Sequence, residues 1–143
     1  MSRLFTGLAL TALLTAASGC AIKPVYFETG QAQLASDDRS SDRSLDCVAR
    51  RMKVMKRSSV AVVGLTDITG DSGANQTLSE QRAAYVRSEL MTRGVDGNRV
   101  DAMGLGEVEA KKKRAIDRRV EFVYYRSRKA TPTADNLYGV FGL

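Results

Sequence analysis

Two oppositely charged residues, Asp67 and Arg82, have the types and the spacing to form a binding site. Asp67 follows the apolar run 60–65 and opens a Gly-rich loop. Arg82 comes 15 positions later in a stretch with helical periodicity, where a helical wheel places it at the rim of the core-facing stripe. If the fold brings their side chains together, a carboxylate and a guanidinium form a clamp with two poles. Such a clamp suits a zwitterionic ligand, because the carboxylate accepts from an ammonium while the guanidinium donates a fork of hydrogen bonds to a carboxylate.

The composition excludes several other kinds of site. The chain has 143 residues, 22 Lys and Arg against 16 Asp and Glu, a net charge of +6, two Cys and no His. Without His, the common imidazole metal sites and His-based nucleophile triads are excluded, and we expect no metal and no cofactor. The length fits one modest domain behind an export segment. The moderate excess of cations suits an anionic neighbour, such as the cell wall or a lipid surface, but it is more commonly just the means by which a domain stays soluble.

The first 19 residues read as a signal peptide. Arg3 gives the positive start, and residues 4–17 form an uncharged run, rich in Leu and Ala, that is short for a transmembrane helix. The following Ala-Ser-Gly-Cys at 17–20 resembles a bacterial lipobox. That resemblance implies that Cys20 becomes the lipidated first residue of the mature protein, and Ala21 after it implies an outer-membrane address. Acyl chains anchor a domain without a transmembrane helix.

Two alternatives to this lipid anchor remain open. Small residues fill positions 15–19, which also permits ordinary signal cleavage nearby. Cys47 falls off the apolar stripe of its helix, so we expect it to be partly exposed and to lack a partner if Cys20 is acylated. The competing arrangement is a Cys20–Cys47 disulfide, which requires that Cys20 is never lipidated.

The hydrophobic pattern predicts strands that alternate with helices. Strands are expected at 24–27, 60–65, 100–104 and 119–125, and helices from Ser40 or Ser41 to about 56 and from about 76 to 93. We expect Asn75 to cap the second helix and Gly94 to end it, and 111–114 to be a short helix or a loop. This order indicates an α+β sandwich, in which the helices cover one face of a small mixed four-stranded sheet.

Four short motifs occur together in the order typical of one family. They are VYFETGQAQL from Val25, TDITGDSGANQTLSEQRA from Thr66, GLGE from Gly104 and DRRVEF from Asp117. Together they resemble the OmpA-like peptidoglycan-binding domain, whose signature is matched at Thr66, Asp67, Gly70, Asn75, Leu78, Ser79, Arg82 and Ala83.

The resemblance implies a ligand and gives a role in binding it to Asp67 and Arg82. Asp67 would take the ammonium of meso-diaminopimelate in the stem peptide of the wall, and Arg82 would take its carboxylate. Thr66, Gly70 and Asn75 would support the loop or the ligand. We expect Arg118 and Arg119, in the last motif, to be structural.

The resemblance also sets the domain boundaries and the expected function. We expect a signal peptide at 1–19, a lipidated N-terminus and short tether at 20–24, an OmpA-like domain at 25–126 and a C-terminal extension at 127–143. The protein would be an outer-membrane lipoprotein, with its domain in the periplasm, that binds peptidoglycan non-covalently, anchors that membrane to the wall and is not an enzyme.

Two other functions are weighed against this one. The first is a wall-binding accessory subunit of an envelope machine, such as a secretion system, in which the apolar segment 136–143 contacts other envelope proteins. The second is a wall hydrolase with Asp67 and Glu80 as paired carboxylates, which only their proximity in sequence supports. We expect no nucleic acid as a partner, because no aromatic residues interleave the basic run 111–114.

Overall fold

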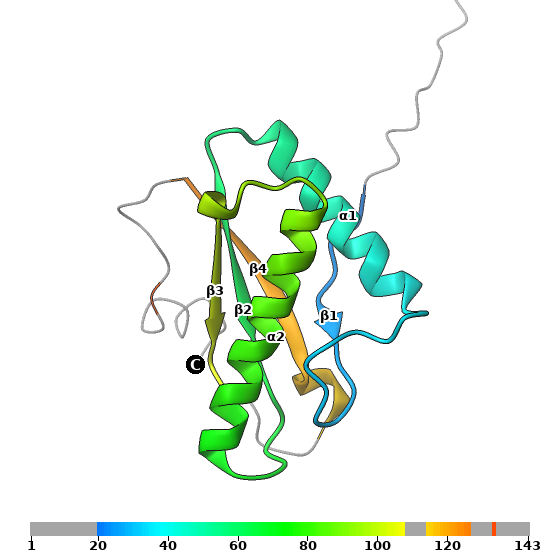
Figure 1. The fold of residues 1–143 in the computed structure, drawn as a ribbon, viewed down its shortest axis with the longest axis vertical. Coiled ribbons are helices and arrows are strands. Elements are labelled where there is room, and N and C mark those ends of the chain that lie inside the picture. Colours follow the sequence, from blue (N-terminus) through cyan, green and yellow to red (C-terminus); the bar gives the residue numbers. More distant parts are fainter. Residues whose placement is uncertain (1–19, 108–113, 127–132, 134–143) are drawn as a thin grey trace, which may run out of the picture.

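The computed structural model describes residues 20–107, 114–126 and 133 (Figure 1). The predicted signal peptide, most of the predicted C-terminal extension and most of the run 111–114 lie outside these residues. The helices and strands are β1 (Val25–Tyr26), α1 (Arg39–Val54), β2 (Ser59–Gly64), α2 (Ser72–Thr92), β3 (Val100–Gly104) and β4 (Arg119–Tyr125), with 3₁₀ turns at Gly97–Arg99 and Ala115–Asp117.

The strands form one mixed sheet in the order β1-β4-β2-β3. β2 lies in the interior of the sheet, parallel to β3 and antiparallel to β4, and β1 pairs with the outer edge of β4. Helices α1 and α2 lie on the same side of the sheet (Figure 1). The predicted α+β architecture, with helices on one face of a small mixed sheet, is therefore confirmed.

β2 is buried on both faces, as its unbroken apolar sequence predicts. Val60 and Val62 pack in the main core between sheet and helices. Ala61 and Val63 belong to a second cluster with Leu65 and Leu105. The chain that leaves β2 is thereby fixed in place, and it carries Thr66 and Asp67 at its end.

Both long helices begin earlier than the sequence predicts, because Asp residues cap them. The Asp38 side chain accepts from the amides of Ser40 and Ser41, so α1 begins at Arg39. The Asp71 side chain accepts from the amides of Gly73 and Ala74, so α2 begins at Ser72 and the loop after β2 is shorter than expected. The prediction that Asn75 caps α2 is wrong, since Asn75 lies inside the helix and is buried.

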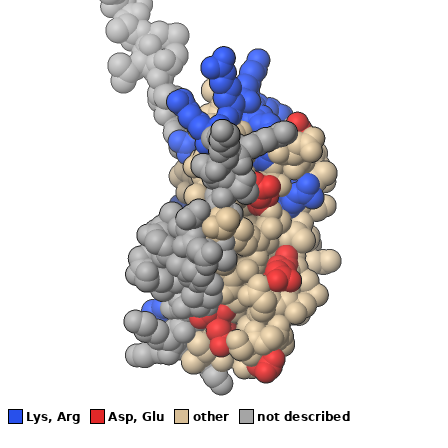
Figure 2. All heavy atoms as spheres, turned by 90° about the vertical axis from the view of Figure 1, so that its left-hand side faces the viewer, with Lys and Arg blue, Asp and Glu red and all other residues tan. Residues whose placement is uncertain are grey.

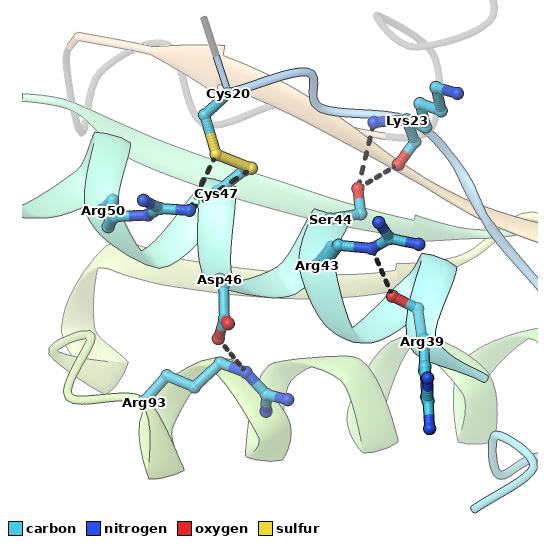
Figure 3. Close-up of a disulfide and its surroundings, with 9 residues drawn as sticks. All are labelled: Cys20, Lys23, Arg39, Arg43, Ser44, Asp46, Cys47, Arg50 and Arg93. Atoms are coloured by element: carbon cyan, nitrogen blue, oxygen red, sulfur yellow. Dashed lines mark hydrogen bonds and ion pairs between the residues drawn. A yellow bond between two sulfur atoms is a disulfide. The ribbon is translucent and has the colours of Figure 1, made fainter. Parts of the chain in front are cut away.

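The structure contains the disulfide that the sequence analysis left as the competing arrangement. Cys20 is bonded to Cys47 on α1, with 5.5 Å between their Cα atoms (Figure 3). The expectation of a partly exposed, unpaired Cys47 is therefore corrected, because this residue is only 7% exposed. A lipidated Cys20 is likewise not what the structure contains, since its sulfur is bonded to Cys47. Among the described residues, no helix is both long and apolar enough to cross a bilayer.

Two glycines let α2 pack unusually close to the sheet. A Cβ atom on Gly64 of β2 would overlap the backbone carbonyl of Ser79, and one on Gly104 of β3 would overlap Ser79 and Glu80. This close approach allows the Ser79 hydroxyl to accept a hydrogen bond of 2.9 Å from the amide of Gly106. The Ser79 side chain of α2 thus holds the loop that follows β3, beside the end of β2.

We expect Gly64→Ala to destabilise the domain by about 3 kcal/mol, because the added methyl meets rigid helix backbone. Urea unfolding followed by circular dichroism measures this loss. The matched control is Gly73→Ala in the exposed first turn of α2, where the nearest atom to the new methyl is a side-chain oxygen of Asp71 at 3.1 Å. Equal stability of the Gly64 variant and the wild type would contradict the close packing.

Candidate functional site

Asp67 lies at the end of β2 in a fixed backbone and is only 4% exposed. The amide of Leu65 donates to the carbonyl of Arg119, and the amide of Thr66 donates to the carbonyl of Gly106. One carboxylate oxygen of Asp67 accepts from the amide of Thr69 at 3.1 Å. The backbone therefore orients this carboxylate before any ligand is present.

The other carboxylate oxygen of Asp67 pairs with Arg118, which sequence analysis had assigned to a structural role. Arg118 Nη1 lies 3.0 Å from Asp67 Oδ2, and Arg118 Nε donates to the carbonyl of Phe27 at 3.1 Å. The Arg118 side chain is 15% exposed. Its position follows from the sheet: β4 runs antiparallel to β2 with Gly64 opposite Val120, so residues just before β4 lie beside those just after β2. Sequence reasoning missed Arg118 as a site residue, and the antiparallel pairing of the two predicted strands is the signal that could have found it.

Arg82 is completely buried, although the helical wheel placed it at the rim of the core-facing stripe. Its guanidinium donates to three backbone carbonyls: Gln31 at 2.9 Å, Leu65 at 3.0 Å and Glu28 at 3.2 Å. Its Cζ atom lies 5.1 Å from the ring centre of Phe27. Arg82 thus ties the segment after β1 to the end of β2, at Leu65, two residues before Asp67.

The three charges influence one another. The pKa of Arg82 is lowered to about 10, mainly by burial and also by the positive charge of Arg118, while the negative charge of Asp67 opposes the shift. Burial alone would raise the pKa of Asp67, but the hydrogen bonds from Arg118 and from Thr69 outweigh it and hold that pKa below its usual value. Asp67 is therefore ionised at neutral pH, and two guanidiniums share its single negative charge.

A groove opens beside this charged cluster. It has a volume of about 480 Å³ and is lined by Tyr26, Phe27, Glu28, Ala35, Asp38, Ala115, Ile116 and Arg118. Tyr26 and Ile116 are exposed, so the groove presents apolar surface next to the carboxylate of Glu28 and the guanidinium of Arg118. A ligand in this groove reaches Arg118 directly, and Arg118 is in contact with Asp67.

The other predicted site residues have different environments. Thr66 is buried, and its hydroxyl has no hydrogen-bond partner in the described part of the chain. Gly70 has a φ of 98°, which only glycine adopts without strain, so its role is to shape the loop. The side-chain amide of Asn75 donates to Glu107 in the loop after β3. Glu80 is exposed and accepts from Gln76 on its own helix, whereas Asp67 is buried against Arg118.

The chain is similar to envelope proteins over most of its described length. The model of the OmpA family matches residues 26–122. Outer membrane protein A of Bordetella avium is 33% identical over 110 residues, which are 73% of this chain and 55% of that protein. The peptidoglycan-binding protein ArfA of Mycobacterium tuberculosis is 37% identical over 106 residues, which are 70% of this chain and 32% of that protein.

A solved structure shares both the fold and part of the sequence. The peptidoglycan-associated lipoprotein of Burkholderia pseudomallei superposes with a TM-score of 0.65 and 27% identity, over 71% of this chain and 89% of that one. The chain spans 55% of the length of the first of these curated relatives and 32% of the second. The similarity therefore covers only part of each of these two relatives.

We expect Asp67→Asn to lower the free energy of unfolding by about 3 kcal/mol at pH 7, because it breaks a buried ion pair. The folded pKa of Asp67 lies below the ordinary value of 3.8, so its contribution is fully present above that pH and is lost as the pH falls through the folded pKa. The gap between wild type and variant should therefore close as the pH falls below 3.8 and through the lowered pKa of Asp67.

Urea unfolding at pH 7 and in acid measures both gaps. The control is Asp37→Asn, which changes an exposed carboxylate. A gap that stays constant with pH would show that the ionised Asp67 carboxylate contributes nothing to stability.

Proposed function

Because the chain belongs to the OmpA family, we propose that it is a non-enzymatic binding module that holds peptidoglycan through the diaminopimelate of the stem peptide. In this proposal Asp67 accepts from the ammonium at the side-chain end of diaminopimelate, and a guanidinium takes the adjoining carboxylate. The domain anchors the membrane that carries it to the wall. Weak single bonds suffice, because many copies face a polymer with many sites.

The observation that carries the proposal is the uneven charge of the cluster at the end of β2. Asp67 is ionised and oriented, and two guanidiniums, Arg82 and Arg118, share it. A zwitterionic ligand adds one ammonium and one carboxylate to this cluster. The carboxylate of the ligand adds a second negative charge, which balances the two positive guanidiniums. The ammonium of the ligand pairs with the carboxylate of Asp67.

The two guanidiniums differ in how a ligand reaches them. Arg118 borders the groove and is available without rearrangement. Arg82 meets a ligand only if the segment Glu28–Gln31 moves, because the carbonyls of both end residues occupy its guanidinium. A ligand carboxylate would then replace these two acceptors, and the bond to the carbonyl of Leu65 would hold the guanidinium in place.

We expect Asp67→Asn to weaken co-sedimentation with isolated sacculi by about thirtyfold or more, because it removes one member of a desolvated charge pair. The control is Asp71→Asn, four residues further on, since Asn caps a helix as well as Asp does and α2 is therefore preserved. Free meso-diaminopimelate should compete with the sacculi, and L-lysine, which lacks the second carboxylate, should not. Wild-type binding by the Asp67 variant would contradict the proposal.

The same assay tests Arg82 through a second matched pair. Arg82→Lys keeps the charge but loses the fork of donors, so sacculus binding should fall. Arg87→Lys changes another arginine of α2 that donates to two carbonyls, those of Val100 and Gly97, away from the site. Both variants lose stability, and only the first should lose binding. Labelled sacculi should release no fragments with either variant or with the wild type.

The attachment to the outer membrane rests on Cys20, and it is an alternative to the observed disulfide. The sulfur of Cys20 carries either a thioether to lipid or the bond to Cys47. In the lipidated form, Cys47 is a free thiol beside Arg50, whose Nη2 lies 3.9 Å from the Cys47 sulfur. We propose that the membrane-anchored protein is this lipidated form, with the domain facing the periplasm.

We expect mass spectrometry of the membrane fraction to find an acylated peptide that begins at Cys20, together with a Cys47 that alkylates without prior reduction. The soluble envelope fraction serves as the control, because any disulfide-bonded protein should collect there with both cysteines protected. An unacylated Cys20 linked to Cys47 throughout the membrane fraction would remove the lipid anchor from the account.

A further inference from the structure

The end of the molecule opposite the candidate site is strongly basic. Exposed cations gather where α1 ends, where β2 begins and where β4 ends, and we call this surface the basic end: Arg50, Lys53, Lys56, Arg57 and Arg126. Figure 2 shows Lys and Arg side chains gathered at one end of the molecule, while most of the Asp and Glu side chains in that view lie further down.

The segment that carries most of these cations contains no acidic residue. The sequence from Cys47 to Thr66 contains five Lys and Arg and no Asp or Glu. In the part of the chain that the structure describes, none of the cations of the basic end forms an ion pair. Arg51 differs from them, because its guanidinium lies over the ring of Tyr124, with 5.2 Å between Cζ and the ring centre. The basic end therefore presents an uncompensated positive surface.

An apolar side chain stands in the middle of these cations. Val54, the last residue of α1, is 82% exposed. It lines a shallow groove of about 590 Å³ together with Met55, Lys56, Arg57, Ser58 and Arg126. An exposed aliphatic residue surrounded by cations matches a lipid surface, where phosphates meet the cations and the apolar group enters the region of the headgroups.

We propose that the basic end docks on the surface of an anionic phospholipid bilayer. The position of the basic end in the fold supports a bilayer as its partner. Arg50 Nη2 lies 3.2 Å from the sulfur of Cys20, so the described chain begins at the rim of the basic end (Figure 3). Asp67 lies at the far end of β2, a strand of six residues that is about 20 Å long. The two binding surfaces thus face in opposite directions along the molecule.

This orientation holds whether or not Cys20 is acylated, so the inference is independent of the lipid anchor and of the wall ligand. Each Lys or Arg close to an anionic bilayer raises partitioning roughly fivefold, and the effect fades within a Debye length of about 10 Å at 0.1 M salt. Cations at the basic end should therefore count far more than cations elsewhere on the same domain.

The test compares two triple variants of the full chain that lose the same charge. The basic-end variant lacks three cations of that surface and carries Lys53→Gln, Lys56→Gln and Arg57→Gln. The matched control variant lacks three exposed cations outside the basic end and carries Lys23→Gln, Arg39→Gln and Arg43→Gln. Partition coefficients are measured by lipid dilution into phosphatidylcholine vesicles with and without about 30% phosphatidylglycerol, at 0.1 M salt. The ratio of the two coefficients isolates the response to lipid charge, because apolar attachment contributes equally to both.

We expect the wild type to prefer the anionic vesicles by at least roughly a hundredfold and the basic-end variant to lose nearly all of that preference. The control variant should stay within a few-fold of the wild type, and raising the salt should weaken only the charge-dependent part. Circular dichroism checks that both variants fold.

Three results would overturn the proposal. The first is a wild-type ratio close to one, and the second is an equal loss in both triple variants, which reports net charge alone. The third is a basic-end variant that keeps its vesicle preference but releases sacculi, which would assign this surface to the anionic groups of the wall. We expect the basic-end variant to bind sacculi as the wild type does. Failure of the docking proposal therefore shows in the vesicle assay, and failure of the proposed wall site shows in the sacculus assay.

Discussion

The structure depends on a buried guanidinium. Arg82 has no exposed surface, yet it remains charged at neutral pH because three carbonyl oxygens and the nearby carboxylate of Asp67 replace the water that burial removes. Its hydrogen bonds draw the segment after β1 against the end of β2. They thereby place Phe27, whose carbonyl also accepts from Arg118, beside the ion pair of Asp67. The groove beside Arg118 exists because this segment is held there.

The domain as a whole presents two different surfaces at the two ends of one short strand. β2 begins at the basic end and finishes at the acidic residue of the candidate site, and it is buried on both faces. Such a strand has little freedom to bend, so the two surfaces keep a fixed distance and direction. The proposed link between membrane and wall would benefit from this rigidity, because packed strands transmit tension from one end of the domain to the other.

The fold was largely predictable from sequence because its signals are local. The apolar run of β2 and the periodic stripes of the helices predicted the interior strand and both helices. The helix starts were placed too late because Asp38 and Asp71 competed with nearby Ser and Asn residues that cap helices equally well. The disulfide was foreseen only as an alternative, since sequence does not show which covalent partner a cysteine sulfur takes.

The candidate site was predicted less completely, because its parts meet only in three dimensions. Asp67 and Arg82 were found from their types and spacing, but a helical wheel placed Arg82 at the rim. The segment that buries it comes from residues more than 50 positions away, which no wheel includes. Arg118 was missed for a related reason, because only the antiparallel pairing of β2 with β4 brings it to Asp67.

The most direct test is a crystal structure of the domain with a stem peptide that contains meso-diaminopimelate. The account predicts that the side-chain ammonium of diaminopimelate lies within hydrogen-bond distance of Asp67, and that its carboxylate contacts the guanidinium of Arg82 or Arg118. A peptide bound elsewhere, with the Asp67–Arg118 pair and the segment over Arg82 unchanged, would contradict it.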